Sequence, residues 1–227
     1  MVEKPDPPPF GQGEPGLDDE RQPPPPTRAQ ALLAEAGVTV YEPGEGLFDQ
    51  PALIYLARRT KHGPAFDVFD HVGRPLAREA ELADYRFGVV RRPYLALFGD
   101  DGQSLFAIRS RWNPWRMYTV SGIESAVVGP QGTEGEIPLT AGREPVGAIV
   151  GLSDYGAFLS SARELRLEDH NGAKAACLQG FPRRYNVGSH AIDWVMTVNP
   201  KLRGPLRRLA VVAPSIARIY LEMDRFA

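Results

Sequence analysis

Cysteine is nearly absent from this sequence of 227 residues, in which Cys177 is the only one. One cysteine excludes an intramolecular disulfide and any metal site built from several thiolates. The N-terminus lacks a charged segment followed by an apolar one, so we expect no secretion signal. These absences favour a reducing, cytoplasmic compartment. The apolar surroundings of Cys177 ("AACL") predict a small buried hydrophobe rather than a nucleophile.

The motifs of common enzyme classes are missing as well. No G-x-S-x-G, H-E-x-x-H or phosphate-loop string occurs. The string "GQGEPG" fits a dinucleotide-binding pattern, but it has neither a strand before it nor a helix after it. The pairs Asp70-His71 and Asp169-His170 fall within predicted turns and do not indicate catalysis. We therefore expect a monomeric protein that is not an enzyme, has no cofactor or metal, and does not bind nucleic acid.

A long hydrophobic run is also lacking. The longest apolar stretch, from Leu209 to Leu221, has 13 residues and contains Arg218. A bilayer crossing needs about 20 apolar residues, so a membrane span is disfavoured. An amphipathic surface helix should show one charged face, whereas this run is apolar all round, which is typical of a buried helix. Pro214 should kink or end that helix.

The first 26 residues hold nine of the 22 prolines and six acidic residues. A segment with so few large apolar residues should be disordered or form polyproline II. Order is expected from residue 27 to residue 227, as one domain. It begins with a helix over 28–36, because Thr27 and Gln30 form a capping box and Gly37 is a C-terminal stop.

After this helix the helical period disappears for some 150 residues. The segments that follow are short, rich in β-branched and aromatic residues, and separated by turns, which predicts an all-β barrel or sandwich over about 38–198. One unit recurs, in which an acid precedes a glycine at a hairpin turn. Gly73, Gly102 and Gly172 should adopt positive φ, while Asp70, Asp100 or Asp101, and Asp169 support the turns by hydrogen bonds. The string "VGPQGTEG" is a degenerate fourth copy.

The order of these segments resembles a known family. "LFDQPALIYLARR", "DVFDHVGRPLARE", "LFGDDGQSLFAIR" and "LEDHNGAKAACLQ", followed by a hydrophobic helix, are similar to the tubby C-terminal-like superfamily, in particular to phospholipid scramblases and LURP-one-related proteins. The resemblance covers roughly residues 45–227. It implies a closed antiparallel barrel of about twelve strands around a central hydrophobic C-terminal helix, here about 205–222.

The resemblance also implies a function in lipid binding. Tubby-type members bind phosphoinositide headgroups through basic side chains, and scramblases are linked to the movement of phospholipids between leaflets, with calcium and a palmitoylated cysteine cluster. This sequence has no cysteine cluster, and it has no acidic calcium loop before the final helix. Calcium control and lipid anchoring of the scramblase kind are therefore not expected.

Two basic groups are the candidate lipid-binding residues. In the first group, arginines and tryptophans lie next to each other, which suits the headgroup level of an anionic bilayer. The same residues could instead form a hairpin that caps one end of the barrel, with the arginines stacked on the indole rings. The second group precedes the final helix, where the macrodipole disfavours cations, and it could simply be a solvated rim. The two groups, which could form one patch, are Arg109, Arg111, Trp112, Trp115 and Arg116, and Lys201, Arg203, Arg207 and Arg208.

Three classes of function remain open. The first is peripheral binding of anionic phospholipid at the inner membrane surface. The alternative is a soluble scaffold or adaptor that binds another protein through the barrel or the proline-rich tail, because polyproline segments are preformed ligands for aromatic grooves. The third is a barrel that holds a small apolar ligand, for which the central helix leaves little room.

Overall fold

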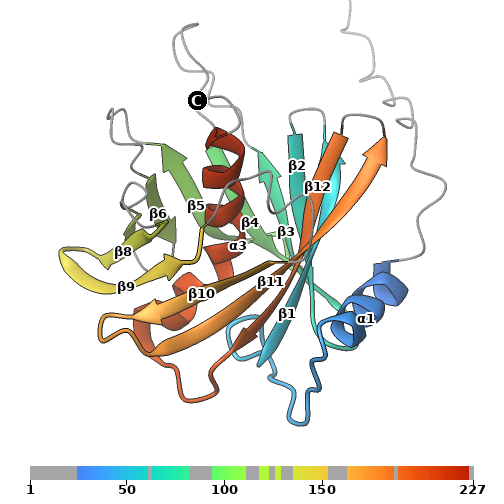
Figure 1. Ribbon diagram of the computed structural model, residues 1–227, viewed down its shortest axis with the longest axis horizontal. Coiled ribbons are helices and arrows are strands. Elements are labelled where there is room, and N and C mark those ends of the chain that lie inside the picture. The colour runs from blue at the N-terminus through green and yellow to red at the C-terminus, as the bar shows by residue number, and fades with distance from the viewer. Residues whose placement is uncertain are drawn as a thin grey trace, which may run out of the picture.

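The computed structural model describes residues 25–60, 63–81, 94–110, 118–122, 126–128, 135–152, 163–186 and 189–224. This part of the chain is mainly β, which confirms the prediction of a mainly β fold (Figure 1). The elements are α1 (Pro25–Glu35), β1 (Ala52–Thr60), β2 (Gly63–Phe69), β3 (Pro75–Glu81), β4 (Tyr94–Gly99), β5 (Ser104–Ser110), β6 (Tyr118–Gly122), β7 (Ala126–Val128), β8 (Ile137–Ala141), β9 (Glu144–Val150), β10 (Arg163–Asp169), β11 (Lys174–Asn186), β12 (Ser189–Val198) and α3 (Gly204–Asp224).

The strands form one antiparallel sheet in which neighbours in sequence lie side by side. The first strand, β1, pairs with β2 on one side and with the last strand, β12, on the other, so that the pairings close into a barrel. Tyr55 of β1 lies opposite both Val68 and Trp194. Because successive residues of a strand point to opposite faces, these side chains share the barrel interior.

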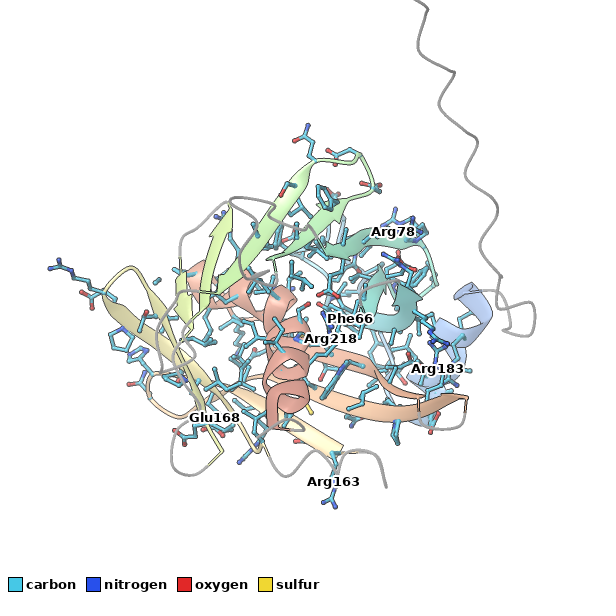
Figure 2. The ribbon with its side chains drawn as sticks, turned by 90° about the horizontal axis from the view of Figure 1, so that it is seen from above. Phe66, Arg78, Arg163, Glu168, Arg183 and Arg218 are labelled. Atoms are coloured by element: carbon cyan, nitrogen blue, oxygen red, sulfur yellow. The ribbon has the colours of Figure 1, made fainter. Side chains whose placement is uncertain are left out.

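Helix α3 supplies the centre of that interior. Leu209, Val211, Val212 and Ile216 are buried and belong to the same hydrophobic cluster as the inward-facing residues of the strands. Figures 1 and 2 show the helix running through the space that the strands surround. The prediction that the final apolar run is a buried helix is therefore confirmed, and the helix extends from Gly204 to Asp224.

The helix does not end at Pro214, so of the two effects predicted for this residue, a kink or an end, the second is wrong. Proline removes one backbone donor, but tertiary packing can offset this loss. The phenol of Tyr55 donates a buried hydrogen bond of 2.7 Å to the carbonyl of Val211, three residues before the proline, which ties this part of the helix to β1. Beyond the proline, Ile216 and Ala217 remain buried in the core. The barrel thus holds both halves of the helix.

Helix α1 packs against the outside of the barrel. Its buried residues Ala29, Leu32 and Leu33 form a second cluster with the outward-facing side chains of β1, among them Ile54 and Leu56. Strand β1 is therefore apolar on both faces. The helix begins at Pro25, two residues before the predicted cap at Thr27, which is consistent with the preference of proline for the first helical turn.

The C-terminal end of α1 has the glycine stop that the sequence predicts at Gly37. Gly37 has φ +66°, its N–H donates to the carbonyl of Ala34, and the N–H of Val38 donates to the carbonyl of Leu33. These two bonds satisfy carbonyls that the end of the helix would otherwise leave without donors.

A buried carboxylate ties α1 to the barrel. The Asp193 side chain, which is fully buried, accepts a hydrogen bond from the backbone N–H of Ala57 at 2.8 Å and from Arg28 at 3.2 Å. Burial raises the pKa of Asp193, although Arg183 and the Ala57 N–H act in the opposite direction. Its neighbour Trp194 is also fully buried. Asp193 and Trp194 therefore have a structural role in the core.

The three predicted hairpin turns are present. Gly73, Gly102 and Gly172 have φ of 89°, 76° and 79°, which a residue with a side chain adopts only at a cost. Asp70 accepts hydrogen bonds from the N–H groups of Val72 and Arg74, and Asp169 accepts them at the equivalent positions. In the turn around Gly102 it is Asp101, not Asp100, that accepts such a bond, from the N–H of Gln103.

Two other expectations lie outside the described residues. They are the disorder of the proline-rich tail, which falls in residues 1–24, and most of the degenerate fourth repeat, which falls in 129–134. Cys177 is a free, buried cysteine whose thiol pKa is raised by burial, so its prediction as a small core residue is confirmed.

Candidate functional site

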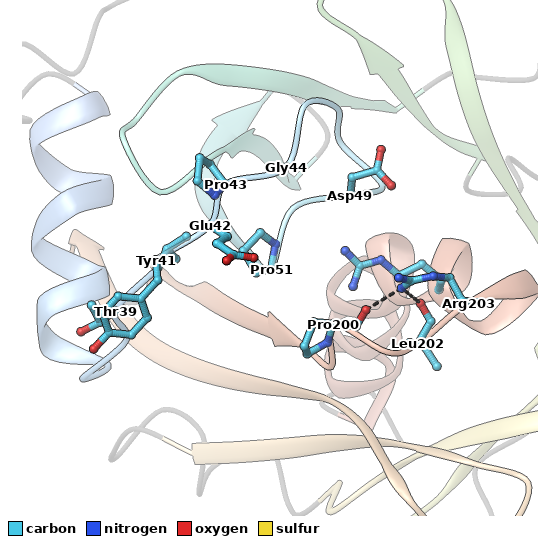
Figure 3. A pocket seen from close by; sticks show the side chains of 12 residues that line it. Thr39, Tyr41, Glu42, Pro43, Gly44, Asp49, Pro51, Pro200, Leu202 and Arg203 are labelled. Atoms are coloured by element: carbon cyan, nitrogen blue, oxygen red, sulfur yellow. Dashed lines mark hydrogen bonds between the residues drawn. The ribbon is translucent and has the colours of Figure 1, made fainter.

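A pocket of about 560 Å³ lies at the end of the barrel where α3 begins (Figure 3). One side of it is the loop between α1 and β1, and the other side is the turn between β12 and α3 together with the first helical turn. The lining residues are Thr39, Val40, Tyr41, Glu42, Pro43, Gly44, Asp49, Pro51, Pro200, Leu202, Arg203 and Arg207.

The loop side of the pocket is built by a tight reversal of the chain. A Cβ atom on Gly44 would lie 2.4 Å from the backbone carbonyl of Asp49, so only glycine permits this close approach. The fully buried Gln50 closes the reversal by donating a hydrogen bond of 2.7 Å from its side chain to the carbonyl of Gly44. The N–H of Asp49 also donates to the carbonyl of Gly46. These contacts place Asp49 at the rim of the pocket.

Arg207, in the first turns of α3, joins the two sides. Its guanidinium donates hydrogen bonds to the carbonyls of Phe48 at 2.6 Å and Gln50 at 2.7 Å. Its Nη1 atom is buried and has no hydrogen-bond partner among the described residues. Burial lowers the pKa of Arg207, while nearby Asp49 acts to raise it. The side chain nevertheless remains charged at neutral pH, because arginine pKa values lie so far above it.

The turn side of the pocket presents a second guanidinium. Arg203 is exposed and donates from Nη1 to the carbonyls of Pro200 at 2.5 Å and Leu202 at 2.8 Å. The turn itself is held by Asn199, whose side chain accepts a hydrogen bond from the N–H of Lys201 and whose carbonyl accepts one from the N–H of Leu202. Arg203 directly precedes Gly204, the first residue of α3.

The pocket also carries negative charge and one exposed aromatic ring. Glu42 and Asp49 are exposed, and Tyr41 is 88% exposed. In Figure 3, Tyr41 and Glu42 lie on the loop side and Arg203 lies across from them. Within the described part of the chain, the carboxylates of Glu42 and Asp49 form no direct hydrogen bond or ion pair, in contrast to the paired acids elsewhere on the barrel.

The structure brings the second predicted basic group together around this pocket. Arg203 and Arg207 line it, Lys201 is exposed on the same turn, and Arg208 is half-buried on the first turns of α3. The sequence had singled out these four cations as candidate lipid-binding residues. It missed the loop residues, because nothing local indicates that residues 39–51 meet residues some 150 positions later.

The first predicted basic group is not part of this site as far as it is described. Arg109 lies near the end of β5, and consecutive antiparallel strands alternate in direction. The end of β5 is therefore at the opposite end of the barrel from the end of β12, where the pocket lies (Figure 1). Arg109 does not share a patch with Arg203 and Arg207. Arg111, Trp112, Trp115 and Arg116 lie outside the described residues.

A second hollow, of about 640 Å³, lies on the outer face of β2, β3 and β4. Phe69, Pro75 and Phe98 give it an apolar character, and Asp67 and Arg78 stand at its edge. These two charged side chains are ion-paired at 2.9 Å. This outer groove therefore has apolar walls, and its two charged side chains at the edge are paired with each other.

Two further properties bear on the class of the site. The described residues contain no cluster of three or more His, Cys, Asp or Glu side chains arranged to hold a metal ion. Among the described helices, none combines the length and the apolar character that a bilayer crossing requires.

Comparison of the chain with protein-family models, curated proteins and solved structures finds no match.

Proposed function

We propose that this chain is a non-enzymatic, tubby-like or scramblase-like protein that binds anionic phospholipid at the inner surface of a membrane. The proposed headgroup site is the pocket at the start of α3. The observation that carries the proposal is the placement of Arg203 and Arg207 together at a helix N-terminus, in a pocket open to solvent.

The electrostatics of this position favour a phosphate group. A helix N-terminus carries about half a positive charge, which attracts anions and disfavours cations. Two guanidiniums beside it add positive charge, which Glu42 and Asp49 of the same pocket offset in part. Unfavourable local arrangements, such as cations at a helix N-terminus, are found most often at functional sites. A bound anion would turn the repulsion into attraction.

The hydrogen bonds of the site also support the proposal. Arg207 uses two groups on backbone carbonyls, which orients the side chain, and its buried Nη1 has no partner among the described residues. A buried donor without an acceptor costs about 1–3 kcal/mol. A phosphate oxygen would satisfy it. Because the arginine is held in place before binding, little side-chain entropy remains to be lost.

The surroundings of the pocket suit a membrane surface. Lys201 is exposed on the same turn, and each lysine or arginine near an anionic leaflet contributes about 1 kcal/mol. Tyr41, exposed at the pocket, has the amphipathic ring that is enriched at the headgroup level of bilayers. The apolar helix α3 faces the core, so the proposed contact is peripheral and electrostatic.

Co-sedimentation with liposomes tests the proposal. We expect the full chain to bind vesicles that contain anionic lipid, to ignore neutral phosphatidylcholine vesicles, and to be released by high salt, because screening acts within about 8 Å at physiological ionic strength. The double variant Arg203→Gln/Lys201→Gln should lose most of this binding. The matched control is Arg166→Gln/Arg143→Gln, which removes the same charge from exposed positions on β10 and the β8–β9 turn.

The alternative function, a soluble scaffold that binds another protein, is favoured by the outer groove with Phe69 and Phe98. Protein binding in an apolar groove would respond weakly to salt. Absence of vesicle binding under every condition would overturn the lipid proposal and leave this alternative. Equal losses in both double variants would show that net charge alone, and not the pocket, is responsible for binding.

A further inference from the structure

We infer that the outer groove on β2, β3 and β4 binds a proline-rich segment of this chain's own N-terminus, residues 5–10 ("PDPPPF"). Among the described residues, this groove and the pocket at the start of α3 have no lining residue in common. The interaction is therefore independent of the proposed lipid binding, and it gives the proline-rich tail a place on the barrel.

The groove has the aromatic walls that suit an extended proline-rich peptide. Phe69 of β2, Pro75 of β3 and Phe98 of β4 line it, and Asp67 and Arg78 at its edge are paired with each other at 2.9 Å. Since both signs of charge are present, apolar contact decides what binds there. Proline-rich segments dock into grooves of this kind because their polyproline II conformation is preformed and costs little entropy to order.

Residues 5–10 have the pattern of such a ligand. Polyproline II has three residues per turn, so Pro5 and Pro8 would lie on one edge, and Pro7 and Phe10 on the next. The first pair gives the P-x-x-P spacing that aromatic grooves recognise. Phe10 is the one aromatic residue among residues 1–24, and it adds apolar area that proline rings alone do not provide.

The tail joins the barrel next to the groove. Helix α1 begins at Pro25 and packs against the outside of β1, the neighbour of β2 (Figure 1). Phe69 belongs to the apolar cluster beneath α1 and also lines the groove. In the β2–β3 turn, the carbonyl of Val72 accepts a hydrogen bond of 3.4 Å from the Gln30 side chain of α1, and Val72 itself is 54% exposed. An apolar surface thus continues from α1 across β2 into the groove.

The chain between the segment and α1 is long enough to reach the groove. The 14 residues 11–24 can span up to about 46 Å, at about 3.3 Å per residue. The centre of the groove, β3, is two strands from β1, which is about 10 Å at a strand spacing of about 4.8 Å. Helix α1 adds at most about 16 Å for its 11 residues. A tether of this length keeps the segment at a high effective concentration, so another protein would have to displace it from the groove.

Disulfide trapping in the full chain measures where the segment lies. In a Cys177→Ala background, Gly11→Cys leaves residues 5–10 intact and is combined with Ala80→Cys in the groove or with Gln179→Cys as the matched control. Ala80 on β3 and Gln179 on β11 are each two strands from β1, and both are half-buried. With oxidised glutathione, we expect the internal disulfide to form at least about tenfold faster in the groove variant, because burial of one phenylalanine ring is worth more than this factor.

Two further arms identify the source of the preference. Adding Pro8→Ser/Phe10→Ser should bring the ratio of the two rates close to one, and a ratio that survives these substitutions would overturn the inference. High salt should leave the ratio unchanged, because only attraction between charges is screened. A ratio lost in high salt would show that the acidic tail is held by charge and would also overturn it.

The remaining outcomes are read from non-reducing gels. Equal rates at the two positions would overturn the inference, because the segment would then have no preference for the groove. Disulfide-linked dimers in place of the internal bond would overturn it as well, since the groove would then bind the segment of a second copy.

Discussion

A buried ion pair joins the C-terminal half of α3 to the inside of the barrel wall. Glu79 of β3 is fully buried, and its Oε2 accepts hydrogen bonds from Arg218 of α3 at 3.1 Å and from the backbone N–H of Phe66 at 2.9 Å. The Arg218 side chain is 12% exposed and lies over the Phe66 ring, 5.4 Å from its centroid. Figure 2 shows Arg218 and Phe66 together inside the barrel, whereas Arg163 points away from it.

The substitution Arg218→Met should destabilise the protein strongly. It preserves the apolar stem of the side chain but leaves the charge of Glu79 uncompensated in the core, and removing one partner of a buried ion pair costs about 3–5 kcal/mol. The exposed pair Lys174–Glu164 provides the contrast, because its side chains are 54% and 47% exposed. Breaking an exposed pair costs about 0–1 kcal/mol, so Lys174→Met should have little effect.

A double variant separates the charge from the packing. In Glu79→Gln/Arg218→Met the buried charge is gone, while the amide oxygen can still accept from the Phe66 N–H. We expect this variant to recover at least half of the free energy of unfolding that Arg218→Met loses, as measured by urea denaturation with circular dichroism. The reasoning would be refuted if Arg218→Met cost no more than Lys174→Met, or if the double variant were no more stable than Arg218→Met.

Two further predictions concern the hairpin between β10 and β11. Gly172→Ala should lower the free energy of unfolding by about 1–2 kcal/mol through backbone strain alone, because φ is +79° and a Cβ would meet no atom within 4 Å. Gly172→Asn should lower it less in the same urea titrations, because asparagine tolerates positive φ better than alanine does. Equal losses for the two variants would contradict this explanation. The pKa of Asp169 is lowered, chiefly by the Ala173 N–H, so its ionised form stabilises the fold above the pKa of the unfolded chain, and this contribution is lost as pH falls through the folded-state pKa. Asp169→Asn should therefore be less stable than the wild type near pH 6 but not near pH 2, and a difference independent of pH would argue against the assignment.

The pocket lies at the end of the barrel that also carries three of the described hairpins. The hairpins around Gly73, Gly102 and Gly172 connect β2 to β3, β4 to β5 and β10 to β11, so they lie at the same end as the β12–α3 turn. Backbone and side-chain hydrogen bonds hold these turns, and a rigid frame is what a preorganised charged site requires.

Local features were predictable from the sequence because their causes are local. An acid followed by glycine determines a turn through hydrogen bonds over a few residues, as at Asp70 and Asp169. The burial of α3 was also predictable, since a short run that is apolar on every side has only the protein core to occupy. One exception is the path through Pro214, where contacts with the barrel outweigh the preference of the residue itself.

The pocket at the start of α3 was decided by the tertiary structure. Its cations were visible in the sequence, but Arg207 finds its partners at Phe48 and Gln50, 159 and 157 positions away. No periodicity carries information over such a distance. The separation of Arg109 from Arg203 likewise follows only from the alternating direction of the strands. The sequence by itself thus determined the turns, the β-rich architecture and the burial of the last helix, because these depend on neighbouring residues and on hydrophobicity. Which charges meet, and which acids remain unpaired beside them, depends on closure of the barrel, which brings distant segments together.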